Sequence, residues 1–402
     1  MITRRFLLQS AAVAAAYSAQ GFRAAQAENA PGVTDTEIKI GQALPYSGPL
    51  SAYGVIGRAE AAYFGMINAQ GGVNGRKLNL ISVDDAYSPP KTVEQVRRLV
   101  EQEKVAFLFQ TLGTACNLAI RQYCNDNKVP QLFLLTGASV FADPQHFPWT
   151  MGFIPNYQTE AHIFAKHILA TKPNARIGVL YQNDGFGKDY LIGLKAGLGP
   201  DNASKVVEEA SFEASDPTVD SQIATLQGSG ADVLVIAAAG KFAPLAIRKA
   251  YDIGWRPARY LFYGSGSIAL LKLAGLDKSK GLFTTLWIKD VNVPNWKDDP
   301  GILAWKAFTD KYMSPTEFSD SNAEEGFIAA GAIVQALKQC GDDLSRENIM
   351  RQAANLRDIE SPLLLPGIKI NTSPTNYSPI RQLQLATFNG ANWEPIGGVL
   401  SD

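Results

Sequence analysis

The sequence predicts an α/β protein built from two doubly wound lobes. Two observations support this fold class. Stretches rich in β-branched and apolar residues alternate with helical stretches along most of the chain, and the alternation restarts near residue 154. Strands separated by helices of about 10–15 residues form parallel sheets covered by helices on both faces. A length of 402 residues, 46% of them hydrophobic, is sufficient for two separate cores.

The first series begins with residues 37–44, EIKIGQAL, where polar and apolar residues alternate as in a half-buried strand. Residues 54–70 show helical periodicity, and the glycine-rich stretch 71–77 is a turn because glycine tolerates positive φ. A helix at 89–103 opens with two prolines, which fit the first helical turn. The other expected elements of this series are strands 78–85, 105–110 and 129–135 and a helix around Cys116.

The second series repeats the alternation. Its expected strands are 175–181, 204–212, 231–238 and 258–264, and its expected helices are 158–171, 187–198, 218–228 and 241–253. The chain then continues with helices 299–313, 321–340 and 345–356 and with β-like segments 363–371 and 380–390. No low-complexity linker separates the two series, so short crossing segments should join the lobes, and the cleft between them is the expected ligand site.

Charge and composition exclude several classes of protein. The chain has 37 basic and 38 acidic residues, which leaves no basic field for nucleic acid. Only three histidines limit metal chemistry, and His162 and His167 are spaced so that they point to different helix faces. We therefore expect no nucleic-acid partner, no metal and no cofactor.

Enzyme signatures are incomplete. Residues 185–187 begin like a dinucleotide-binding fingerprint, but Tyr190 occupies the position of the third glycine. Residues 264–267 lack the spacing of a nucleophile elbow. Asp84 and Asp85 end a strand, where capping of the next turn is a simpler role than acid–base catalysis. The protein is therefore not expected to be an enzyme.

Residues 1–27 have the pattern of an export signal. Arg4 and Arg5 precede an apolar stretch that is too short to span a bilayer, and Ala25-Gln26-Ala27 resembles a cleavage site. The arginine pair indicates a twin-arginine signal, with a general secretion signal as the alternative. The mature protein is expected to be soluble and periplasmic, without direct membrane insertion.

Export makes disulfides possible, but the cysteines do not suit one. Cys116 and Cys124 lie eight residues apart on an expected helix, a rise of about 12 Å, whereas a disulfide needs Cα atoms within about 7 Å. Cys340 is distant in sequence. Three buried free thiols are expected.

The order of motifs resembles the periplasmic Leu/Ile/Val-binding proteins, the receptors of branched-chain amino-acid ABC importers. The shared motifs are IKIG, PYSGPLSAYG, INAQGGVNGRKL, VLYQNDGFGKDY, GADVLVIAAAG and AIRKAYDIGW, and the resemblance covers residues 37–400. It implies a type I periplasmic binding protein, a monomer whose two lobes are joined by a three-segment hinge and which delivers its ligand to a membrane permease. Lobe I is then 28–153 plus 287–370, and lobe II is 154–286 plus 371–402.

The resemblance also implies where the ligand binds. The loop after the third strand, with Thr111, Gly113 and Thr114, should hold a carboxylate at a helix N-terminus. A second loop contributes Gly137 and Ser139, although Thr114 and Ser139 would also serve as plain helix caps. The other expected ligand contacts are Tyr53, Tyr157, Phe186, Lys241 and Ser265, with Trp287 as a further candidate wall residue.

Departures from the family pattern bear on the ligand. Amino-acid receptors of this type place a glutamate of lobe II near the ligand ammonium, but residues 237–242 and 263–269 contain no carboxylate, and Lys241 is present instead. Tyr157 also stands where the family often has an acid. A buried ammonium needs compensation. Two ligands therefore stay open, a branched-chain or other hydrophobic amino acid and a non-amino carboxylate such as an aromatic acid, and the chemistry slightly favours the second.

One further expectation follows from the resemblance, and two alternative functions stay open. The family disulfide should be missing, because Ala86-Tyr87 and Gly113 occupy its positions. An exported hydrolase with its active site in the cleft is one alternative function. A sensory partner that feeds a signalling receptor is another.

Overall fold

The computed structural model describes residues 29–401 and contains two sheets. The first sheet has five parallel strands in the order β2-β1-β3-β4-β5. These strands are β1 (Glu37–Leu44), β2 (Lys77–Asp84), β3 (Phe107–Phe109), β4 (Gln131–Leu134) and β5 (Thr150–Gly152).

Helices cover both faces of this sheet. The helices are α2 (Gly54–Ala69), α12 (Ser321–Cys340) and α13 (Arg346–Ala353) on one face and α3 (Pro89–Arg97) and α4 (Thr114–Asp126) on the other. The alternation of β1 explains the division. Ile40 and Leu44 join the cluster that contains α2 and α12, whereas Ala43 joins the cluster of α3 and α4, because successive strand side chains point to opposite faces.

The second sheet has seven strands in the order β12-β11-β10-β9-β8-β6-β7. Strands β6 to β10 are parallel, and the hairpin of β11 and β12 adds two antiparallel strands beside β10. The strands are β6 (Ile177–Gln182), β7 (Val206–Phe212), β8 (Val233–Ala237), β9 (Ala258–Leu261), β10 (Leu282–Leu286), β11 (Gln382–Phe388) and β12 (Trp393–Ser401). The sheet is therefore mixed at one edge.

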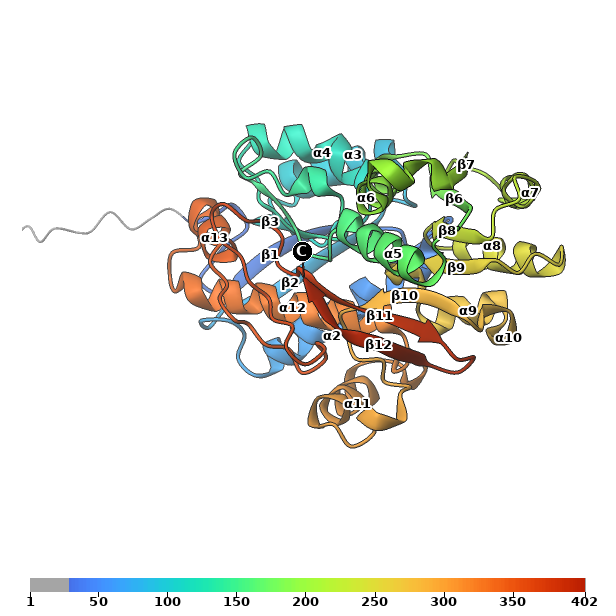
Figure 1. The fold of residues 1–402 in the computed structure, drawn as a ribbon. Coiled ribbons are helices and arrows are strands. Elements are labelled where there is room, and N and C mark those ends of the chain that lie inside the picture. The colour runs from blue at the N-terminus through green and yellow to red at the C-terminus, as the bar shows by residue number, and fades with distance from the viewer. Residues whose placement is uncertain (1–28, 402) are drawn as a thin grey trace, which may run out of the picture.

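The second sheet is also covered on both faces. Helices α5 (Tyr157–Thr171) and α6 (Gly185–Leu198) share a core with the first lobe, and α7 (Asp220–Gly228), α8 (Phe242–Asp252) and α9 (Ile268–Ala274) pack on the other face. In Figure 1, α12 and α13 lie beside β1–β3 on the left, and α7 to α10 (Leu276–Ser279) flank the second sheet on the right. The prediction of two doubly wound α/β lobes is confirmed.

The chain passes between the two sheets three times. The passages lie between β5 and α5, after β10, and between α13 and β11 (Figure 1). After β10 the chain forms α11 (Pro300–Tyr312) and then α12, which packs against α2. Two distant parts of the sequence, α2 and α12, therefore lie together on the first sheet.

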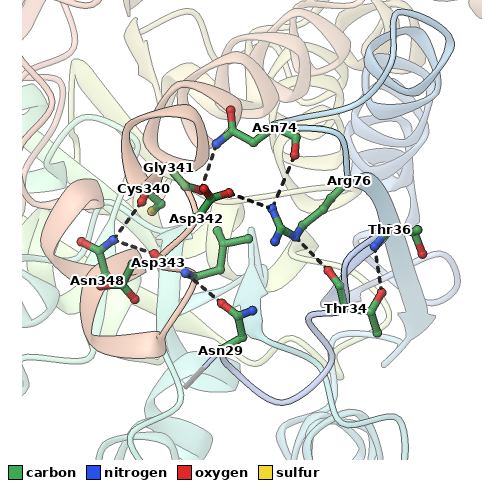
Figure 2. A network of polar contacts seen from close by, with 11 residues as sticks. Asn29, Thr34, Thr36, Asn74, Arg76, Cys340, Gly341, Asp342, Asp343 and Asn348 are labelled. Carbon is green, nitrogen blue, oxygen red and sulfur yellow. Dashed lines mark hydrogen bonds and ion pairs between the residues drawn. The ribbon is translucent and has the colours of Figure 1, made fainter. Parts of the chain in front are cut away.

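A polar network holds the C-terminal end of α12 against the start of the first sheet (Figure 2). The backbone N–H of Ala30 donates to the Leu344 carbonyl at 2.9 Å. Arg76 Nε donates to the Thr34 carbonyl at 2.8 Å, and Asn74 Nδ2 donates to the Gly341 carbonyl at 3.0 Å. These bonds fix α12 in position, and the first turn of the same helix reaches the cleft.

Some sequence expectations differ from the structure. Residues 363–371, expected to be β-like, form no strand and only the isolated bridges Ile288–Leu364 and Ile359–Ile370. Pro366 lacks a donor and Gly367 adopts φ +90°, so the segment bends. Strands β5 and β10 and helices α9 and α10 were not predicted, since short elements have weak periodicity. Strand β12 has nine residues and was not predicted either, because Pro395, Gly397 and Gly398 interrupt its pattern.

Other expectations hold or lie outside the described residues. The three cysteines are free and buried, as predicted. The expected export signal lies outside the described residues. Within residues 29–401, no helix has the length and apolarity required to cross a membrane.

Candidate ligand-binding site

A cavity lies where the two lobes meet, at the carboxyl ends of the strands. Loops that follow β3, β4, β8 and β9 contribute to it, which is where ligands bind in open α/β sheets. The cavity leaves about 50 Å³ for the centres of water-sized molecules, within about 470 Å³ of empty space that includes its mouth. It is lined by Leu50, Tyr53, Ile56, Tyr87, Leu112, Gly113, Thr114, Leu135, Ile154, Tyr157, Phe186, Ala239, Phe262, Tyr263, Gly264, Asn322 and Glu325.

One end of the cavity is the N-terminus of α4. Gly113 precedes the helix with φ +98°, and a side chain there would collide with the Tyr87 ring, so that the position requires glycine. Gly113 and Tyr87 stand at the positions where the family has its disulfide, so a ring packed against glycine is found there, as expected, in place of that bond. Thr114 follows, with its hydroxyl 2.7 Å from the Thr136 hydroxyl. The first N–H groups of a helix lack intrahelical partners, so this end suits an anion.

An aromatic wall forms one side of the cavity. The Tyr157 ring meets Phe186 and Phe262 edge-on, with centroid separations of 4.9 Å and 5.6 Å. Phe262 also contacts Phe186 at 5.0 Å and Tyr263 at 4.9 Å. Such edge-to-face packing makes a rigid apolar surface for the body of a ligand.

The N-terminal end of α12 brings a carboxyl group to the cavity. Glu325 is 5% exposed and has no hydrogen-bond or ion-pair partner among the described residues. Burial raises the pKa of Glu325 to about 8. Asn322 Nδ2 and the Tyr263 hydroxyl lie nearby, and both atoms are buried without a hydrogen-bond partner within residues 29–401. This end of the cavity suits a group that donates hydrogen bonds or carries positive charge.

Sequence reasoning missed this acidic end. The helix begins SNAEEGF, and acids in a first turn ordinarily stabilise the helix dipole, so the pattern gave no reason to suspect a ligand site. The only distinguishing signal was a pair of acids directly before an apolar stretch.

The lobes contact each other around the cavity. The Tyr53 hydroxyl, from the first lobe, accepts a hydrogen bond from the Gly240 N–H at 3.1 Å. The Ser139 N–H donates to Asp189 Oδ2 at 2.8 Å, and its hydroxyl donates to Asp189 Oδ1 at 2.6 Å. These bonds cross the interface between the lobes, so the structure is a closed form.

Several residues expected to bind the ligand line the cavity. They are Tyr53, Gly113, Thr114, Tyr157 and Phe186. Their contact with a ligand stays a prediction. The remaining expected residues, Thr111, Gly137, Ser139, Lys241 and Ser265, and also Trp287, lie outside the cavity lining.

The outlying residues have other roles. Lys241 Nζ donates to the Asp216 carbonyl at 3.0 Å, on a lobe II loop, so the expected cationic contact does not face the cavity. Ser265 lies behind Tyr53 and donates to the Ala238 carbonyl at 2.8 Å. Ser139 donates its two hydrogen bonds to Asp189 across the interface between the lobes, as described above. Each of these three side chains therefore makes its hydrogen bond within the protein.

The strand-end acids act as caps, as expected. Asp84 Oδ1 accepts from the N–H groups of Tyr46 at 2.8 Å and Ser47 at 3.1 Å. Asp85 accepts from the Tyr87 N–H at 2.9 Å and the Thr92 hydroxyl at 2.7 Å. Among residues 29–401, no group of three or more His, Cys, Asp or Glu is placed to hold a metal ion.

Comparison with known proteins agrees with the fold. A family model described as periplasmic binding protein matches residues 37–392, nearly the whole described chain. The chain therefore belongs to the periplasmic binding protein family, and its two lobes have the type I fold of that family.

Relatives within the family are distant. Leu/Ile/Val-binding protein homolog 7 of Brucella suis is 26% identical over 241 residues, which cover 57% of this chain and 59% of the relative. The leucine-, isoleucine-, valine-, threonine-, and alanine-binding protein of Pseudomonas aeruginosa is 25% identical over 253 residues, or 62% of this chain and 66% of the relative. The match thus spans about three fifths of the length of the first curated relatives.

A solved structure supports the fold over nearly the full length. A branched chain amino acid ABC transporter protein from Thermus thermophilus with bound valine superimposes with a TM-score of 0.82 over 92% of this chain and 98% of that chain. The two sequences are 17% identical, so the likeness concerns the fold.

Proposed function

We propose that this protein is the substrate-binding component of a branched-chain amino-acid-type ABC importer. It captures a small hydrophobic carboxylate ligand between its lobes and presents it to a membrane permease. The observation that carries the proposal is the interlobe cavity, which combines an anion-binding helix terminus at Thr114 with an aromatic wall. The curated relatives described above are named as binding proteins, which favours a binding function over an enzyme.

Hinge closure is the proposed mechanism. A ligand held by the Gly113–Thr114 end of the first lobe gains contacts with Phe186 and Phe262 of the second lobe when the lobes close. Binding thereby shifts the population towards the closed form. The hydrogen bonds from Gly240 to Tyr53 and from Ser139 to Asp189 exist only while the lobes touch, so they stabilise the same form.

The ligand proposed first is a hydrophobic amino acid. The sequence argument for a non-amino acid depended on the missing carboxylate of lobe II. Glu325 supplies a carboxyl group from lobe I instead, so compensation for an ammonium is available. An aromatic acid is the second candidate, and the cluster of Tyr157, Phe186 and Phe262 favours it.

The cellular setting is part of the proposal. The protein is exported to the periplasm and acts there as a soluble monomer, without cofactor, nucleic acid or insertion into the membrane. The lobes are 28–153 plus 287–370 and 154–286 plus 371–402. This division is supported by the strands, since those of the first sheet fall within the former set and those of the second within the latter.

Calorimetric titration tests the proposal. Leucine, phenylalanine, benzoate and a hydroxycinnamate are titrated into the wild-type protein and into Thr114→Val. At least one ligand should bind, and the variant should lose at least about tenfold in affinity because a helix-terminal contact to the carboxylate is disturbed. Thr225→Val, an exposed threonine on α7, is the matched control and should bind as the wild type does.

Tight leucine binding would exclude the aromatic-acid candidate. Mass spectrometry of ligand released from gently denatured protein gives an independent answer. Release of a molecule without a carboxylate would contradict the proposal.

A further inference from the structure

A second cavity adjoins the ligand cavity. The two share Tyr263, Gly264, Asn322 and Glu325, so they meet at the start of α12. The second cavity leaves about 40 Å³ for the centres of water-sized molecules. Its wall is completed on the far side by Trp287, Trp393, Lys289, Asp290 and Glu324, among others.

Polar groups without partners surround this junction. The Tyr263 hydroxyl, Asn322 Nδ2 and Glu324 Oε2 are buried and make no hydrogen bond within residues 29–401, in residues only 9%, 4% and 1% exposed. Glu325 likewise has no partner in that part of the chain, as described above. Buried polar atoms are almost always bonded, to protein or to ordered water, so a cluster of atoms without protein partners lining one space is suited to a polar ligand group.

The ionisable side chains that line the second cavity are mostly carboxyl groups. Its lysine, Lys289, is already held by Asp299 at 2.8 Å and by the Pro362 carbonyl at 2.8 Å. Asp290 is engaged as well, since it accepts from the Trp393 N–H at 3.0 Å. Glu324 and Glu325 are therefore left without a cation among the described residues.

The groups that face Glu325 from neighbouring elements do not supply a cation either. They are Glu60 on α2 and the phenols of Tyr53, Tyr157 and Tyr263. Arg58, near the N-cap Asp320, is paired with Glu317 at 2.8 Å. Burial raises the pKa of Glu325 to about 8 and that of Glu324 well above its usual value, where Asp290 and Asp320 add to the rise. Both carboxyls become good partners once a positive group enters.

The architecture separates this acidic end from the anion-binding end. Helix α4 lies on one face of the first sheet and α12 on the other, and both begin at the cleft. Apolar residues such as Leu112, Leu135 and Ile154 line the space between them. A ligand that satisfies both ends carries its two charges at separate places.

We propose that the second cavity is a cation subsite, in which Glu324 and Glu325 hold an ammonium or guanidinium group that the ligand carries apart from its carboxylate. The proposal rests on the proposed function, since the carboxylate is held at Thr114. Among the small carboxylates of the proposed function, it favours those with a distal cationic group over α-amino acids such as leucine, whose ammonium lies next to the carboxylate.

Matched ligand pairs test the subsite by calorimetry. The pairs are 4-aminobutyrate with butyrate, 5-aminovalerate with pentanoate and 6-aminohexanoate with hexanoate, with leucine as the α-amino reference. In at least one pair, the wild-type protein should bind the amine at least tenfold more tightly than the plain acid and more tightly than leucine. Glu325→Gln should remove that preference by weakening the amine at least tenfold more than the plain acid. Glu94→Gln, an exposed glutamate on α3, is the control.

Proton release provides a second readout that needs no variant. At pH 7, the amine should displace a proton from the carboxyl pair, so its binding heat should vary with the ionisation enthalpy of the buffer, whereas the heat of the plain acid should not. Glu324→Gln should reduce this release even if Glu325→Gln fails to fold.

The outcomes separate this inference from the proposed function. One outcome is that the protein binds leucine or the plain acids no less tightly than the distal amines, with Thr114→Val weakening that binding. This result would overturn the cation subsite and leave the proposed function standing. Absence of binding by every carboxylate would overturn both.

Discussion

Glu160 is a carboxyl group buried beneath the aromatic wall. It is fully buried and accepts hydrogen bonds from the Tyr263 N–H at 3.1 Å, from the Thr285 hydroxyl at 2.7 Å and from the Tyr190 hydroxyl. Among residues 29–401 no cation offsets the burial, and desolvation raises the pKa of Glu160 from the usual 4.5 to about 8. At neutral pH the residue is therefore a neutral hydrogen-bonding hub that positions Tyr263 beside the ligand cavity.

This raised pKa predicts how stability depends on pH. The folded protein keeps a proton that the unfolded chain releases above about pH 4.5, so Glu160 lowers stability as pH rises towards 8, with a limiting slope of about 1.4 kcal/mol per pH unit. Glu160→Gln, which resembles the protonated form, should gain stability relative to the wild type from pH 5 to pH 8. Urea unfolding at unit pH steps measures the difference, and Glu94→Gln should show no such trend. A pH-independent difference between Glu160→Gln and the wild type would contradict the raised pKa.

Helix α12 is the element that joins the packing of the first lobe to the ligand site. Its C-terminal end is held by the polar network of Figure 2, and its N-terminal end presents Asn322 and Glu325 to the cavity. Gly326, one residue on, lets the helix approach α2. A side chain there would place its Cβ 2.6 Å from the Ile56 carbonyl oxygen. The position of the acidic end thus depends on one close helix contact.

Gly326→Ala tests that dependence. Despite the higher helix propensity of alanine, the variant should lose about 1–3 kcal/mol of stability, because the clash involves backbone that cannot rotate away. Gly331→Ala, later in the same helix, meets only the Tyr63 hydroxyl at 3.4 Å and should be neutral or stabilising. Chemical denaturation of both variants gives the comparison. Equal stability of the two would show that the approach of α12 to α2 is looser than the structure indicates.

At the scale of the whole molecule, hydrogen bonds between the lobes hold the closed arrangement, and one carboxylate accepts two of them. Asp189 on α6 accepts from the Ser139 N–H and hydroxyl and also from Gln158 Nε2 at 2.6 Å. The first two bonds cross between lobes, and the third holds the carboxylate in place from α5. Ligand affinity and lobe closure should therefore both depend on Asp189, although it does not line the cavity.

Asp189→Ala should shift the ligand-free protein towards an open form. Small-angle scattering should give a larger radius of gyration for the variant than for the wild type. Calorimetry with the ligand that the wild type binds should give an affinity roughly tenfold weaker for the variant, because binding must then also close the lobes. Asp201→Ala, an exposed aspartate, should change neither quantity. Scattering curves that coincide with and without the substitution would contradict a role for Asp189 in closure.

The sequence by itself determined the architecture and half of the cavity. Period-two and helical patterns are local, so the alternation of strands and helices in two series was predictable, and the helix at 321–340 agrees with α12. The resemblance to the Leu/Ile/Val-binding proteins supplied Tyr53, Thr114 and Phe186 as candidates, and all three line the cavity. Only the tertiary structure decided the rest. Glu325 reaches the cavity from a helix more than 200 residues beyond Thr114 in the chain, and Lys241 turns to the Asp216 carbonyl instead. Local periodicity contains no information about which distant segments pack together, and that packing places a carboxyl where the sequence had suggested none.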